Sequence, residues 1–131
     1  MTRAILAVVA GLLTWMVVAT LLNFGLRAGL AGYTLAEPTM TFTLGMKVAR
    51  LILGALASLA AGAAAGLIAP SKTGPRWVLG GIILALFIPV HIQLWAKFPV
   101  WYHLVFLGTL LPLVAMGGAF SGIRRSAPVQ L

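Results

Sequence analysis

Four long apolar segments constrain the fold of this chain more than any other feature of its sequence. The first runs from Ala4 to Leu26 without a charged side chain, and at about 1.5 Å per helical residue it can cross a hydrocarbon layer roughly 30 Å thick. Similar segments cover residues 51–69, 77–95 and 101–123. Only 8% of the 131 residues are charged, whereas soluble domains carry about 25%. The sequence therefore predicts an integral membrane protein with four transmembrane helices.

The links between the segments predict how the helices are arranged. Those on either side of the third segment are too short to hold a domain, and Pro70, Gly74 and Pro75 form a break before it. Neighbouring helices should then pack as antiparallel hairpins. The expected fold is an all-α, up-and-down four-helix bundle that forms one membrane domain over residues 1–131.

The start of the second helix is predicted from Glu37 and Pro38. An acidic residue followed by proline is typical of an N-cap and a first helical position. The alternation of polar and apolar residues at 39–46 would suit a strand, but a single strand leaves its backbone groups unpaired at a membrane surface. We therefore expect a helix over residues 38–69, with residues 51–69 as its membrane part.

The distribution of cations predicts the orientation. With four spans both termini lie on one side, and that side carries five basic side chains: Arg3, Lys72, Arg76, Arg124 and Arg125. The opposite side carries four: Arg27, Lys47, Arg50 and Lys97. The positive-inside rule puts both termini in the cytoplasm. Because the difference is small, insertion in both orientations and an antiparallel homodimer form an alternative.

One face of the second segment carries small residues at every fourth position: Gly54, Ser58, Gly62 and Gly66. Such a face lets another helix backbone approach closely. We expect its partner within the chain, at Gly11 or at Gly118 and Gly122, and the same face of a second copy is the alternative. This pattern indicates helix packing rather than chemistry.

Polar side chains gather at the end of the bundle opposite the termini, and they predict a polar pocket there. Its expected members are Asn23, Glu37, Arg50, His91, Gln93 and His103. Ionisable groups are costly in hydrocarbon, and they mark functional sites in membrane proteins. Counting from the terminus side places His91 roughly 9 Å deeper than Arg50 and His103. The aromatic residues Trp77, Trp95, Trp101 and Tyr102 are expected to anchor the helices at the membrane interfaces.

Three functions fit this pocket. The leading hypothesis is binding of an anionic lipid headgroup, or support of a membrane protein partner. The first alternative is a small proton-linked transporter or channel, with His91 as the titrating group. The second is haem or metal binding through His91 and His103, with Glu37 as a third ligand, although their difference in depth argues against it. No cofactor or metal is expected.

Other classes of function find no support in the sequence. No serine-elbow, HExxH, Walker or dinucleotide motif is present, so we do not expect an enzyme. The net charge of +8 does not indicate nucleic acid, because the cations lie at the ends of apolar segments, where lipid phosphates are the nearest anions. The segments "AEPTMTF", "PVHIQLW" and "FPVWYHLVFL" resemble those of small four-span bacterial inner-membrane proteins without a known activity. The resemblance implies that membrane and no reaction.

Overall fold

The computed structural model describes residues 2–70 and 73–126, and in them the chain forms four long helices and two short helical turns. The long helices are α1 (Thr2–Gly29), α3 (Leu44–Ile68), α4 (Gly74–Gln93) and α5 (Val100–Ser126). The short turns between α1 and α3 are α2 (Tyr33–Ala36) and η1 (Glu37–Thr39). All four long helices are apolar and long enough to cross a membrane. The prediction of an all-α bundle is confirmed, and the chain is a multi-pass membrane protein.

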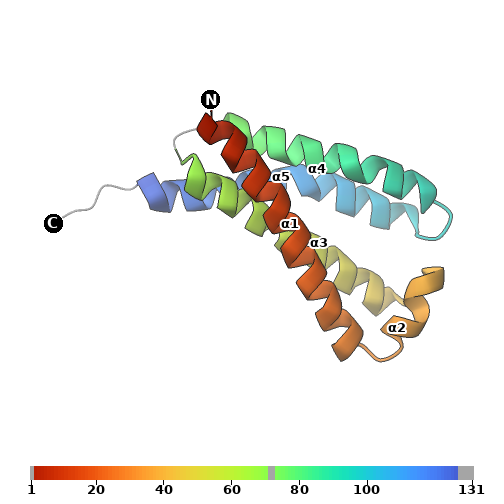
Figure 1. Ribbon diagram of the computed structural model, residues 1–131. Coiled ribbons are helices and arrows are strands. Elements are labelled where there is room, and N and C mark those ends of the chain that lie inside the picture. The colour runs from red at the N-terminus through yellow and green to blue at the C-terminus, as the bar shows by residue number, and fades with distance from the viewer. Residues whose placement is uncertain (1, 71–72, 127–131) are drawn as a thin grey trace.

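The long helices alternate in direction (Figure 1). α1 begins and α5 ends at one end of the bundle, which we call the terminus end. The α1–α3 connection, residues 30–43, and the α4–α5 connection, residues 94–99, lie at the other, which we call the loop end. The predicted polar residues therefore share one end of the molecule.

The small-residue face of α3 packs against α5 of the same chain. A Cβ atom added at Gly62 would overlap the carbonyl group of Val114, and one added at Gly66 would overlap the carbonyl group of Gly118. These two helices touch through their backbones because no side chain separates them. Gly117 brings α5 against the backbone of Leu59 in the same way.

The other members of that face contact aromatic rings. Gly54 leaves space for the ring of Phe106. The hydroxyl of Ser58 is buried; it donates to the carbonyl of Gly54 (2.7 Å) and accepts from Nε1 of Trp15 (3.1 Å). Gly11 brings α1 against Leu79 and the carbonyl of Ala61. Three helices are thereby fixed around the middle of α3.

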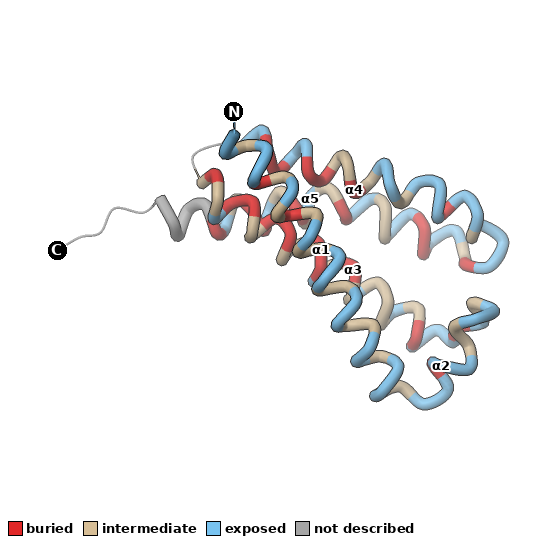
Figure 2. Tube along the Cα trace, viewed as in Figure 1, coloured by how far each residue is buried: buried red, intermediate tan, exposed pale blue. Residues whose placement is uncertain are grey.

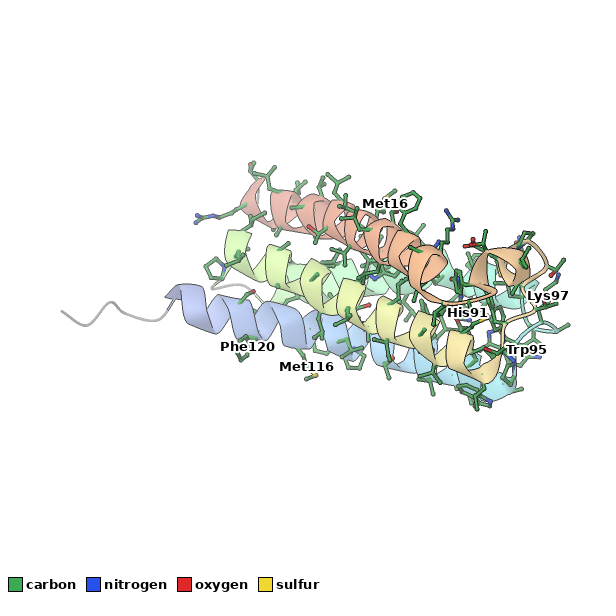
Figure 3. All side chains as sticks on the ribbon, turned by 90° about the horizontal axis from the view of Figure 1, so that it is seen from below. Met16, His91, Trp95, Lys97, Met116 and Phe120 are labelled. Atoms are coloured by element: carbon green, nitrogen blue, oxygen red, sulfur yellow. The ribbon has the colours of Figure 1, made fainter. Side chains whose placement is uncertain are left out.

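The first half of α1 packs into the bundle more tightly than the second. Its buried residues, Ala7 and Gly11, both lie in the first half (Figure 2). Toward the loop end α1 and α4 diverge (Figure 1). On the outer surface, exposed side chains such as Met16 of α1 and Met116 and Phe120 of α5 point away from the bundle (Figure 3).

The predicted start of the second helix is wrong. The helix does not begin at Pro38: Glu37–Thr39 is a separate 3-10 turn, Met40 has a left-handed backbone (φ 56°), and α3 begins at Leu44. Thr43 is the N-cap of α3, and its hydroxyl accepts from the amide of Met46 (3.3 Å). Met40 is a turn residue and residues 41–43 form no helix, so the part of the expected helix over residues 40–43 is absent.

Candidate functional site

A continuous set of hydrogen bonds joins α1, the α2–η1 turns and α3 at the loop end. Nη1 of Arg50 donates to the hydroxyl of Tyr33 (2.7 Å), which donates to Oδ1 of Asn23 (2.8 Å). Nδ2 of Asn23 then donates to Oε2 of Glu37 (3.1 Å). Glu37 also accepts two bonds from Arg27, at 2.7 and 3.2 Å. Three of the six predicted pocket residues, Asn23, Glu37 and Arg50, are thus brought together.

Glu37 is the only acidic side chain in the sequence, and it is paired with Arg27. The hydrogen bond from Arg27 holds the pKa of Glu37 below its usual range, and the bond from Asn23 acts in the same direction. The carboxylate is therefore ionised at neutral pH. Both of its oxygens accept hydrogen bonds from protein groups.

Arg50 has no such carboxylate. It lies in the second turn of α3, stacks on the ring of Phe42 at 4.8 Å, donates a hydrogen bond to the hydroxyl of Tyr33 (2.7 Å), and lies beside the hydroxyl of Tyr102; both hydroxyls are neutral. Its Nε atom is buried and finds no hydrogen-bond partner in the described part of the chain. A guanidinium within a membrane helix is costly unless it is paired. Arg50 therefore has unused capacity to bind an anion.

Arg50 faces a cavity of about 420 Å³ between the helices at the loop end. The polar side chains Thr20, Asn23, Arg27, Glu37 and Arg50 line the part nearest the connections. The deeper part is lined by apolar and aromatic side chains: Trp15, Leu53, Phe87 and Phe106. Because Thr20, Phe24 and Arg27 of α1 line it and are also exposed, the cavity reaches the molecular surface beside α1.

An aromatic cluster closes the loop end above this cavity. Tyr33 and Phe42 from the first connection, Phe98 from the second and Tyr102 from the first turn of α5 are all buried together. The rings of Phe42 and Phe98 lie 6.0 Å apart, and those of Phe98 and Tyr102 lie 4.4 Å apart. The two connections are thereby joined, and the cluster contacts Arg50 through Phe42.

The two histidines form a pair beside the cavity and do not line it. Nδ1 of His91 and Nδ1 of His103 lie 2.7 Å apart, so one ring donates to the other. Both are buried, with 5% and 1% of their surface exposed, and Trp95 stacks on His103 at 4.7 Å. Nε2 of His103 is buried without a hydrogen-bond partner in the described residues. Figure 3 shows His91 and Trp95 at the loop end.

The predicted difference in depth between the histidines is wrong. His91 lies two residues before the end of α4, and His103 lies three residues after the start of α5, so both are about one turn from the same connection. The count from the terminus side assumed that the start of α4 and the end of α5 lie at the same level, and the hydrogen bond between the two rings shows that this assumption does not hold. The depth of each histidine in the bundle follows from its distance to the α4–α5 connection, which is about one helical turn for both.

A haem or metal at the histidines does not fit this arrangement. A bis-histidine haem holds its iron between the two nitrogens, which are then about 4 Å apart at the ~2.0 Å typical of metal–imidazole bonds, whereas these nitrogens are 2.7 Å apart and hydrogen-bonded. Glu37, the suggested third ligand, binds Arg27. Across residues 2–70 and 73–126 no group of three metal-ligating side chains occurs.

Two further site predictions are corrected. Gln93 is exposed and does not line the cavity, because it is two residues, about 200° of helix rotation, from the buried His91. Tyr102, expected as an interface anchor, is buried in the aromatic cluster and lines the cavity. Trp77, Trp95 and Trp101 are exposed, as interface anchors would be, and that role stays a prediction.

Sequence reasoning missed several contributors to the site. Tyr33, which links Arg50 to Asn23, is fully buried although it lies in a connection. Gly32 before it has a positive φ of 80°, and this turn directs Tyr33 back into the bundle. Phe42, Trp15 and Phe87 also contact or line the site, and their sequence neighbourhoods give no signal beyond apolarity.

The fold and site define a four-helix, multi-pass membrane protein with an amphipathic cavity between its helices. Comparisons of the chain with protein-family models, with curated proteins and with solved structures give no match. Its function is therefore argued from the site itself.

Proposed function

We propose that this protein binds an anionic membrane amphiphile, a lipid or lipid-like molecule with a phosphate-bearing headgroup, in the loop-end cavity. The sequence left lipid binding and support of a membrane partner open together, and the cavity favours the first. Arg50 would hold the headgroup, and the apolar part of the cavity would hold the chain.

The observation that carries this proposal is the state of Arg50. Arg50 lines the cavity, its buried Nε has no partner in the described residues, and the only acidic side chain in the sequence is bound to Arg27. Leaving a cation uncompensated in a low-dielectric site costs several kcal/mol by order of magnitude. An anionic ligand would supply the missing counter-charge to the guanidinium.

The extent of the cavity supports an amphiphile over a free anion. Along α1 its lining runs from Trp15 to Arg27, which spans about 18 Å at ~1.5 Å per residue. A phosphate group alone would fill only the polar end. Thr20, Phe24 and Arg27 line the cavity and are exposed, so an acyl chain could enter from the bilayer beside α1.

Native mass spectrometry with defined lipids tests this proposal. The wild-type protein, offered phosphatidylglycerol, phosphatidylcholine or inorganic phosphate, should retain phosphatidylglycerol alone. Arg50→Gln should lower the retained fraction at least about tenfold, which corresponds to ~1.4 kcal/mol. Lys47→Gln is the matched control, because it removes a cation from the same helix outside the cavity lining.

Two outcomes would overturn the proposal: equal retention of phosphatidylcholine, or equal loss in Lys47→Gln and Arg50→Gln. If Arg50→Gln fails to fold, Arg50→Lys replaces it. That variant keeps the charge but loses the planar fork of donors, so retention should fall without being abolished. Retention of inorganic phosphate in place of the lipid would assign the polar end of the cavity to a free anion.

We further propose that the protein lies in a bacterial inner membrane with both termini in the cytoplasm, which puts the cavity in the outer leaflet. The sequence resemblance and the cation count support this orientation. The natural chain has no cysteine, so Lys97→Cys should react with an impermeant thiol reagent added to whole cells, and Thr2→Cys should not. Reaction of both would indicate dual insertion.

Proton-linked transport is the second candidate, and the buried His91–His103 hydrogen bond favours it. Such a pair can hold and pass one proton. Reconstituted liposomes should then show a flux that changes with pH near neutrality and falls in His91→Ala. An unchanged flux would remove the pair from the mechanism.

A further inference from the structure

The cavity contains an unequal number of positive and negative side chains, and this imbalance selects among anionic ligands. We propose that Glu37 sets the charge selectivity of the site, which favours monoanionic phosphodiester headgroups over dianionic phosphomonoesters. The inference rests on the lipid binding proposed above and names the class of headgroup.

The charge count follows from the lining. Among the described residues that line the cavity, three are charged: Arg27, Glu37 and Arg50. Their formal charges sum to +1. Lys47 and Lys97 do not line the cavity, and Nζ of Lys97 is directed to the carbonyl of Thr39 at 3.4 Å. One additional negative charge therefore makes the occupied site neutral.

The hydrogen bonds of Arg27 and Arg50 indicate which of the two cations can bind the ligand's phosphate group. Arg27 donates to Glu37 from both Nε and Nη2, so its charge is already paired with the carboxylate. Arg50 is the lining cation without a carboxylate partner, since its hydrogen bond goes to the neutral hydroxyl of Tyr33. A phosphodiester offers two oxygens that share one charge, which suits a single guanidinium.

A second charge on the ligand would find no partner. It would lie in the same cavity as the carboxylate of Glu37, where the two like charges repel each other. The extra charge also loses hydration when it enters. Glu37 therefore acts as a specificity residue through its charge, in addition to fixing η1 against α1.

A set of charge variants tests this, with phosphatidylglycerol and phosphatidic acid of identical acyl chains as probes. At pH 8 the phosphomonoester is dianionic, since its second pKa is about 6. Native mass spectrometry measures the ratio of phosphatidic acid to phosphatidylglycerol retained. The ratio should be below one in the wild type and rise at least about tenfold in Glu37→Gln, where the cavity charge becomes +2.

The double variant Arg27→Gln/Glu37→Gln is the matched control, because it removes the ion pair but restores the charge of +1. Its ratio should return to the wild-type value. Arg27→Gln alone, with a charge of zero, should retain neither lipid. If Glu37→Gln does not fold, Arg27→Gln and the double variant still differ only in the charge at position 37, and the double variant should regain phosphatidylglycerol.

The outcomes separate the two proposals. A wild type that retains no anionic lipid overturns both. A wild type that retains phosphatidylglycerol and phosphatidic acid equally, or a ratio that Glu37→Gln leaves unchanged, overturns only the role of Glu37. A double variant that behaves like Glu37→Gln would mean that the ion pair acts through its geometry and not through its charge.

Discussion

Adding one methyl group at Gly62 should separate the two central helices. In Gly62→Ala the new Cβ would overlap the carbonyl of Val114 and press on the amide of Gly118. Overpacking of a core typically costs 1–3 kcal/mol. Here the opposing atoms belong to the backbone of α5, so no rotamer change can relieve the overlap. We therefore expect a loss of about 2–3 kcal/mol, at the upper end of that range.

The assay is equilibrium unfolding in mixed micelles, with increasing SDS and helicity followed by circular dichroism. Gly108→Ala is the matched control, since a Cβ there meets nothing within 4 Å. Alanine has a higher helix propensity than glycine by about 1 kcal/mol, so this control should be neutral or slightly more stable. Equal unfolding midpoints for Gly62→Ala and Gly108→Ala would refute the close α3–α5 contact.

The remaining predictions concern three local interactions. His91→Leu leaves His103 buried without a hydrogen-bond partner and should lower the unfolding free energy by about 1 kcal/mol in the same assay. The double variant His91→Leu/His103→Leu should recover most of this stability. Additive losses from the two substitutions would argue against the pair. Because the folded protein lowers the pKa of Glu37, its ion pair should contribute fully above the ordinary glutamate pKa of about 4.3 and be lost as the pH falls through the lowered value. Thermal unfolding between pH 7 and pH 3 should show this loss in the wild type and not in Glu37→Gln, and equal pH profiles would contradict it. Thr43→Ala removes the N-cap of α3 and should cost about 0.5–2 kcal/mol, whereas Thr41→Ala should change the midpoint little.

The bundle was predictable because hydrocarbon admits few backbone arrangements. An apolar segment of about 20 residues must form a helix when it crosses a bilayer, and the four segments and their short links left little choice. The stripe at Gly54, Ser58, Gly62 and Gly66 was readable for the same reason: a helix repeats every 3.6 residues, so small residues at every fourth position share a face. The structure shows that face buried against α5.

The start of α3 was mispredicted because two local patterns compete in the same connection. Glu37 and Pro38 have the chemistry of a helix start, but Glu37 is engaged by Arg27 and Asn23. Thr43 offers an N-cap six residues later, and the structure uses it. A contact between residues ten positions apart, Arg27 and Glu37, decided the outcome, and local propensity carries no information about it.

The site was predictable in its position but not in its membership. All six expected residues lie toward the loop end, since polar groups avoid the hydrocarbon. Which of them meet depends on helix rotation and on how α1 diverges from α4. Asn23, Glu37 and Arg50 line one cavity, the histidines pair with each other, and Gln93 is directed outward.

The most direct test of the account is a density map of the protein purified with its native lipids, inspected beside the guanidinium of Arg50. We expect elongated density, with its strongest feature within hydrogen-bond distance of Arg50 and its tail running toward Trp15 and Phe87. Density for water alone, or an Arg50 side chain turned away from the cavity, would contradict the proposal that this site holds an anionic amphiphile.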